Sequence, residues 1–171
     1  MSVLVVGIDP GSITGIGILS ANAVVDAWQD EPRPALRRLV QWLRENRAAT
    51  SMIGVEDAFM GKGPHASLHV ARAGGFCEGV LFSIGYPESN VIRLHPSKWR
   101  SEISIKGKDR DAKEAHARVI AEGMCPRRFS KGETHMAEAL CMAQVTWNTL
   151  ARSHNSSVWR NNSVEVGGFA G

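Results

Sequence analysis

Hydrophobic residues at the start of the chain fall into three short runs separated by turn residues. The first run covers residues 4–8 and ends at Asp9, because Pro10 and Gly11 do not continue a strand. Two further runs cover residues 13–19 and 23–28, and the pattern predicts a hairpin meander of three strands. A carboxylate at a strand end beside a glycine-rich turn suits a metal ion or a phosphate, although Asp9 could equally cap the turn.

After this meander, the hydrophobic residues recur at the spacing of a helix. Residues 35–44 carry an apolar stripe and predict a helix that packs on the sheet; the stripe comprises Leu36, Leu39, Val40 and Leu43. Residues 51–57 form another apolar run, which ends in Glu56 and Asp57. The order strand, helix, strand is typical of a βαβ unit with a parallel strand pair, so we expect an α/β fold.

The second half of the chain predicts three more helices and a fifth strand. Residues 66–84 form a helix rich in small residues, and residues 90–94 form the strand. A short helical piece begins at Lys98, and residues 111–122 form a helix whose expected apolar side comprises Ala112, Ala115, Val119 and Ile120. The last helix covers residues 135–151.

Length and composition indicate one globular domain, which we place at residues 1–152. The chain has 171 residues, of which 43% are hydrophobic and 22% charged. The Ser-, Asn- and Gly-rich stretch over residues 153–171 predicts a flexible tail. We find no secretion signal and no membrane span, and three scattered cysteines favour a reducing cytoplasm, with an organelle or a phage-infected cell as alternatives.

Positive charge is concentrated in two stretches, residues 93–110 and 127–131, in a chain of net charge +3. Such side chains bind phosphates without reading sequence, and as a set they favour DNA. For any one of them, a solvated surface position is the simpler interpretation. The candidate DNA-binding residues of basic type are Lys62, Lys98, Arg100, Lys106, Lys108, Arg110, Lys113, Arg127, Arg128 and Lys131.

Acidic residues end two of the predicted strands, and a third lies in the last helix. Asp9 and Glu56 follow strands that we expect to be neighbours, while His135 and Glu138 share one helix face because they are three residues apart. Taken singly, Glu56 could be a solvated strand end and Glu138 an acid favoured by the helix dipole. If the four converge, their oxygen ligands favour Mg²⁺ or Mn²⁺, and two such ions could clamp a phosphodiester.

Three motifs together resemble RuvC-type Holliday junction resolvases of the RNase H-like superfamily. They are Gly7-Ile8-Asp9-Pro10-Gly11-Ser12 followed by Thr14-Gly15, then Val55-Glu56-Asp57-Ala58-Phe59-Met60, then His135-Met136-Ala137-Glu138-Ala139-Leu140. The match covers residues 3 to about 150 in element order. The resemblance implies an RNase H-like fold with a mixed five-stranded sheet flanked by helices, a homodimer, and Mg²⁺-dependent nicking of two opposed strands at a four-way DNA junction.

The resemblance also implies roles for individual residues. Asp9 and Glu56 would be the first two metal-binding carboxylates, and His135 occupies a position where many members have Asp and some have His. Glu138 replaces the usual Asp, so Mn²⁺ is the alternative to two Mg²⁺ ions. Phe59, followed by Met60, matches an aromatic residue that the family uses against bases at the junction centre, where stacking is worth ~1–3 kcal/mol. The divergent last motif points to a phage- or organelle-like branch.

Several alternatives remain open at this point. The protein could be a general branched-DNA or RNA·DNA nuclease with little junction preference, or a junction-binding protein without catalytic activity. The small-residue helix over residues 66–84, with Phe76 and Phe82, could form the dimer contact or simply pack in the core. Whether a branch-migration motor is a partner is not indicated by any motif.

Overall fold

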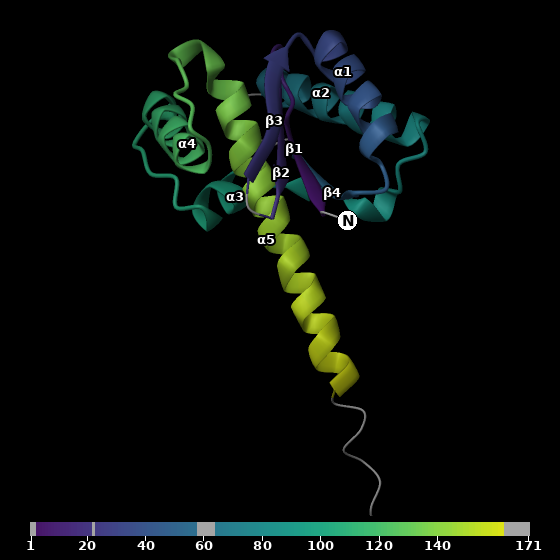
Figure 1. The fold of residues 1–171 in the computed structure, drawn as a ribbon. Coiled ribbons are helices and arrows are strands. Elements are labelled where there is room, and N and C mark those ends of the chain that lie inside the picture. The colour runs from purple at the N-terminus through teal and green to yellow at the C-terminus, as the bar shows by residue number, and fades with distance from the viewer. Residues whose placement is uncertain (1–2, 22, 58–63, 163–171) are drawn as a thin grey trace, which may run out of the picture.

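A computed structural model describes residues 3–21, 23–57 and 64–162 of the chain. Its centre is one five-stranded sheet in the order β3-β2-β1-β4-β5 (Figure 1). β1 pairs antiparallel with β2 and β2 with β3, whereas β4 runs parallel to both β1 and β5. The strands are β1 (Leu4–Asp9), β2 (Thr14–Ser20), β3 (Ala23–Asp30), β4 (Thr50–Glu56) and β5 (Val91–Leu94). The predicted meander, the parallel pair and the mixed five-stranded α/β sheet are confirmed.

Helices cover both faces of the sheet, because alternate side chains of a strand point to opposite faces. α1 (Pro32–Asn46) and α2 (Pro64–Ser83) lie on one face, where Val6 and Ile8 share a buried cluster with Leu39 of α1 and Leu81 of α2. α3 (Pro96–Glu102), α4 (Arg110–Met124) and α5 (Thr134–Asn162) lie on the other (Figure 1). Two short 3-10 turns, η1 (Glu88–Asn90) and η2 (Lys131–Glu133), precede β5 and α5.

The buried sides of α1 and α4 can be compared with the apolar stripes predicted from the spacing of their hydrophobic residues. In α1 the predicted stripe is confirmed, since Leu36, Leu39 and Leu43 are buried. In α4 the prediction is wrong for three of the four residues, because Ala112 and Ala115 are exposed and Val119 is 61% exposed. Ile120 packs against a core cluster as predicted, and the fully buried residues are Ala117 and Ala121. α4 packs on α5 rather than on the sheet, and the small side chains of its alanines are the ones that permit a close helix–helix approach.

Helix α5 crosses the sheet at unusually short range. Gly7 of β1 and Gly15 and Gly17 of β2 face its backbone, and a Cβ built on Gly17 would lie 2.6 Å from the backbone nitrogen of Leu140. Any side chain at these three positions would overlap the main chain of α5. The glycines therefore determine how closely the first turns of α5 approach the ends of β1 and β4.

The far end of α5 differs from the sequence-based expectation. The helix predicted to end at residue 151 continues to Asn162, so the expected flexible tail is helical over its first part, and residues 163–171 lie outside the described residues. Figure 1 shows the C-terminal half of α5 extending well beyond the sheet. Among the described residues, no helix, α5 included, is long and apolar enough to cross a lipid bilayer. The domain boundary at residue 152 stays a prediction.

Candidate active site

Two of the predicted acids lie at the carboxyl ends of adjacent parallel strands. Asp9 is the last residue of β1 and Glu56 the last residue of β4, and these strands pair in parallel from Val5 to Ile8. Ligands of open α/β sheets bind at this edge, because the loops that leave the strands diverge there. Asp9 is buried and Glu56 partly buried, so neither carboxylate is simply solvated at a strand end.

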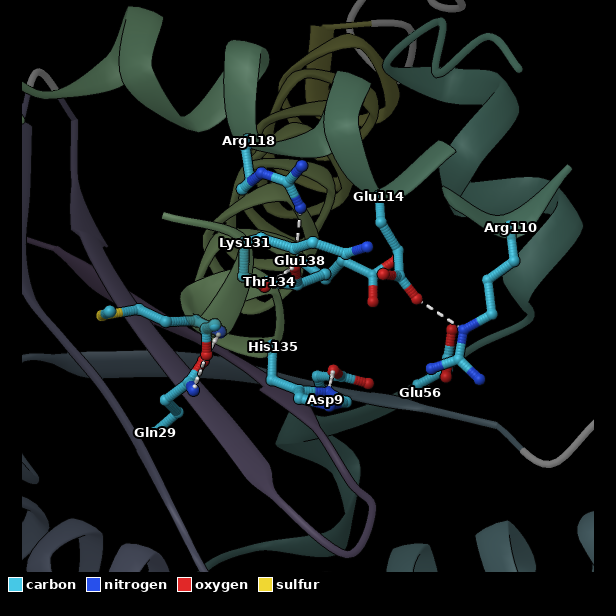
Figure 2. Close-up of polar contacts among 12 residues, drawn as sticks. Asp9, Gln29, Glu56, Arg110, Glu114, Arg118, Lys131, Thr134, His135 and Glu138 are labelled. Atoms are coloured by element: carbon cyan, nitrogen blue, oxygen red, sulfur yellow. Dashed lines mark hydrogen bonds and ion pairs between the residues drawn. The ribbon is translucent and has the colours of Figure 1, made fainter. Parts of the chain in front are cut away.

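The first turns of α5 bring the other two predicted residues to the same edge (Figure 2). The ring nitrogen Nδ1 of His135 donates a hydrogen bond of 2.6 Å to Oδ2 of Asp9. Glu138 is buried one turn further along the helix. One ligand atom from each of Asp9, His135 and Glu138 lies within 4.8 Å of the others. The structure thus brings together the helix pair and the strand-end carboxylate, while their roles stay predictions.

Glu56 is held beside this group by two residues of α3. Nε1 of Trp99 donates a 3.0 Å hydrogen bond to Oε1 of Glu56. Nη2 of Arg100 lies 3.5 Å from the same Glu56 oxygen and 3.2 Å from Oε1 of Glu138. A single guanidinium group therefore joins the strand-end acid to the helix acid.

These side chains line a cleft of about 570 Å³. Its wall includes Asp9, Glu56, His135 and Glu138, and on the opposite side residues of the α3–α4 region. Glu114 of α4 is among them, and its carboxylate is paired with Arg110 one helical turn earlier (Figure 2). Sequence reasoning missed Glu114, Trp99 and His69, which also line or support the cleft. The spacing of four residues between Arg110 and Glu114 was the available signal for that ion pair.

Burial and mutual repulsion shift the proton affinities in the cleft. Burial, and next the charge of Asp9, raise the pKa of Glu56 to about 8, although Arg100 acts in the opposite direction. The same two causes raise the pKa of Glu138 to about 7, again opposed by Arg100. The hydrogen bond to Asp9 raises the pKa of His135. In the metal-free cleft both carboxyl groups are therefore biased toward their neutral form, and a bound metal ion would favour the ionised form instead.

The predicted DNA-binding residues that the structure describes lie in three places. Four of them line the cleft: Arg100, Lys108, Arg110 and Lys113. Lys98 and Lys106 are exposed on α3 and on the segment that follows it. The remaining basic residues precede α5, where Arg127 pairs with Glu133, Lys131 lies 3.9 Å from Asp111, and Arg128 is exposed. Phe59, Met60 and Lys62 lie outside the described residues.

Among comparisons with known proteins, only the comparison with solved structures gives a match. No protein-family model and no curated protein matches the chain. Thermus thermophilus RuvC in complex with a Holliday junction substrate superposes with a TM-score of 0.65 and 18% identity, over 88% of this chain and 96% of that chain. Thermus thermophilus RuvC in a second structure gives 0.63 and 19%, with the same coverage.

A Fowlpox virus resolvase in complex with Holliday junction DNA aligns less well, with a TM-score of 0.42 and 14% identity over 91% of this chain and 98% of that chain. This similarity is too low to decide between branches, so a phage- or organelle-like origin stays a prediction. The two RuvC comparisons, together with the strand order, confirm the fold that the resemblance of the three motifs implied. The chain has the RNase H-like fold of RuvC.

Proposed function

We propose that the protein is a metal-dependent endonuclease that cuts four-way DNA junctions by paired nicks. The observation that carries this proposal is the convergence of Asp9, Glu56, His135 and Glu138 in one cleft of a RuvC-like fold. The three residues Asp9, His135 and Glu138 already present ligand atoms within 4.8 Å. The RuvC in one of the compared structures is bound to a Holliday junction, and this supports a branched DNA substrate here.

The donor set fits a divalent metal ion. Carboxylate oxygens and one imidazole nitrogen suit Mg²⁺ and Mn²⁺, and the crowded acids need positive charge. Asp9, His135 and Glu138 would hold one ion, and Asp9 with Glu56 a second. Bound ions would lower the pKa of a water nucleophile and stabilise the leaving oxygen of the phosphodiester. Trp99 keeps the Glu56 carboxylate in place through its hydrogen bond.

The basic wall of the cleft would hold the DNA backbone. Lys108, Arg110 and Lys113 come from the start of α4 and the segment before it, and all three face the same cleft as the acids. Lysine and arginine contacts to phosphates position DNA without selecting its sequence. The second basic group, around Arg127 and Arg128, would extend this contact along the DNA, away from the reacting phosphate.

A homodimer through α2 would supply the two sites that paired nicks require. Leu68, Phe76 and Phe82 of α2 are 49%, 44% and 38% exposed, although they are large and apolar. Gly75 and Gly79 lie between them along the helix and meet nothing within 4 Å where a Cβ would be. A second copy of the same helix could approach this smooth face closely, which is how an isologous interface with two-fold symmetry forms.

The test uses a labelled immobile four-way junction with Mg²⁺ or Mn²⁺. We expect symmetric paired nicks that require metal and that fall by roughly a thousandfold in Asp9→Asn, since the lost ligand removes several kcal/mol of transition-state stabilisation. Asp111→Asn is the matched control, because Asp111 is an exposed aspartate on α4.

Other outcomes would redirect the proposal. Equal cutting of flaps and forks would identify a general branched-DNA nuclease in the same cleft. Tight junction binding with no cutting in either metal would identify a binding protein, and the proposed metal-ligand role of Glu138 would then be wrong.

A further inference from the structure

Arg100 occupies the space between the two acids that come from different elements. Its single nitrogen Nη2 lies 3.5 Å from Oε1 of Glu56 and 3.2 Å from Oε1 of Glu138. Among the described residues, no other side chain forms hydrogen bonds to both carboxylates. The guanidinium therefore contacts one proposed ligand of each metal ion, Glu138 of the first and Glu56 of the second.

The rest of the Arg100 side chain is held incompletely. Its Nε is buried and lacks a hydrogen-bond partner, which is a costly arrangement for a charged group. The guanidinium lies over the ring of Trp99, 4.7 Å from the ring centroid, so a flat aromatic surface supports it without fixing it by a directed bond. The contacts to Glu56 and Glu138 are thus the main polar contacts of this guanidinium.

A neighbouring hollow offers this side chain a second position. Arg100 lines not only the acidic cleft but also an adjacent cavity of about 410 Å³. That cavity is bordered by Ser97 and Ser101 of α3 and by Lys113 of α4, and Lys113 also lines the acidic cleft. Because Arg100 lines both hollows, a change of its side-chain rotamer would be enough to take the guanidinium from one to the other.

We propose that Arg100 is a built-in counter-ion that competes with the divalent metal for Glu56 and Glu138. In the metal-free protein its single positive charge is shared between the Glu56 and Glu138 carboxyl groups, and the guanidinium leaves them when both bind metal. The released guanidinium then lies beside the basic wall, where a DNA phosphate can bind it. Since the released form gains this partner, junction DNA and metal strengthen each other's binding. This inference rests on the proposed metal-dependent function.

The competition is measured without any catalysis. Calorimetric titration of the metal-free full chain with MnCl₂ compares the wild type with Arg100→Gln, Arg100→Lys and Arg110→Gln. Arg110 is the matched control, because it lines the same cleft and carries the same charge, but its hydrogen bond goes to Glu114. We expect Arg100→Gln to bind Mn²⁺ roughly tenfold more tightly, as a charge-assisted contact no longer has to be broken. Arg110→Gln should change the affinity far less.

A second measurement uses the wild-type protein and guards against a variant that does not fold. The Nε resonance of Arg100, assigned by its absence in Arg100→Lys, should shift during a titration with Mg²⁺ and reach a plateau with metal saturation. An unshifted resonance at saturating metal would contradict the proposal.

Three calorimetric outcomes would also overturn it. If Arg100→Gln binds Mn²⁺ no more tightly than the wild type, the competition fails while the metal-dependent function stands. If Arg100→Gln and Arg110→Gln gain affinity equally, the effect is a general one of charge. If no variant binds Mn²⁺, this inference and the proposed function fail together.

Discussion

Two sets of glycines in this protein differ in how much space surrounds them: one is tightly packed and the other is open. Gly7, Gly15 and Gly17 of the sheet lie against the backbone of α5 and leave no room for a Cβ. Gly75 and Gly79 of α2 meet nothing within 4 Å. Glycine costs a helix about 1 kcal/mol relative to alanine, so the second pair weakens α2 without improving the packing of its own chain. Contacts within one molecule explain the first set, whereas no contact among the described residues explains the second, which is compatible with the dimer proposed above.

The sheet glycines matter because α5 carries half of the candidate site. A Cβ on Gly15 would overlap the main chain of His135, which hydrogen bonds to Asp9. A Cβ on Gly17 would meet Leu140, two residues after Glu138. Close approach at these positions is thus the condition for bringing a helix carboxylate and an imidazole to a strand end. Among the described residues, the α2 glycines do not lie against the backbone of α5, although Gly75 lines a hollow that also includes Glu56.

Substitution of a sheet glycine (Gly7, Gly15 or Gly17) should change the stability of the protein most. Gly17→Ala places a Cβ 2.6 Å from a backbone nitrogen of α5, and the helix has to shift. We expect the free energy of unfolding to fall by about 3 kcal/mol, the upper end of ordinary overpacking costs. Urea denaturation followed by circular dichroism measures the change.

Gly123→Ala is the control for that experiment. Gly123 lies near the end of α4 with open space at its Cβ position, so alanine should be neutral or stabilising by up to about 1 kcal/mol. Equal stabilities of Gly17→Ala and Gly123→Ala would show that α5 does not need the close approach.

The pH dependence of stability should be the next largest effect, and we expect it from the acidic cleft that α5 and the sheet form together. In the metal-free protein, Glu56 and Glu138 have pKa values raised to about 8 and about 7. Their unfolded-state values lie near 4, so between pH 4 and pH 8 the native state binds more protons than the unfolded state, and stability falls as the pH rises. Each carboxyl that titrates contributes a slope of at most about 1.4 kcal/mol per pH unit.

Thermal unfolding at pH 5, 6, 7 and 8 checks this slope. Saturating Mg²⁺ should flatten it, and so should the double variant Glu56→Gln/Glu138→Gln. A metal-free wild type that is more stable at pH 8 than at pH 5 would contradict the assignment of these two groups. The effect of Gly79→Ala should not vary with pH, because Gly79 does not line the acidic cleft.

Substitution of the α2 glycines, Gly75 and Gly79, should change stability least, and it should increase rather than decrease the free energy of unfolding. Gly75→Ala and Gly79→Ala should each stabilise the isolated chain by about 1 kcal/mol, because alanine favours the helix. If α2 contacts a second copy, the same methyl groups weaken the dimer. Sedimentation equilibrium distinguishes the two effects, and Gly123→Ala again serves as the control. An unchanged association constant in both α2 variants would place the dimer contact elsewhere.

Much of the fold could be predicted because its signals are local. The strand that ends at Asp9, the helix with Leu36 and Leu39 facing inward, and the strand that ends at Glu56 each follow from a short pattern. The convergence of His135 and Glu138 on Asp9 followed from helix spacing and from the rule that sites lie at strand ends.

The parts that could not be predicted depend on contacts between distant residues. Periodicity allows two stripes on α4, and only its packing against α5 selects Ala117 and Ala121 over Val119. Arg100 could be expected near DNA, but its position between Glu56 and Glu138 arises from the placement of α3 beside two other elements. The end of α5 was missed because Ser and Asn tolerate a helix that starts upstream, although they rarely begin one.

The length of helix α5 makes the orientation of the domain measurable. It begins beside Asp9 and spans 29 residues, so its axis is roughly 44 Å long at the usual rise per residue. The sheet glycines fasten one end, and Figure 1 shows the other end standing clear of the sheet. A dye attached near Asn162 would therefore report the direction of the whole domain. If the proposed dimer binds a junction, the distance between two such dyes would report how the two protomers are oriented relative to each other.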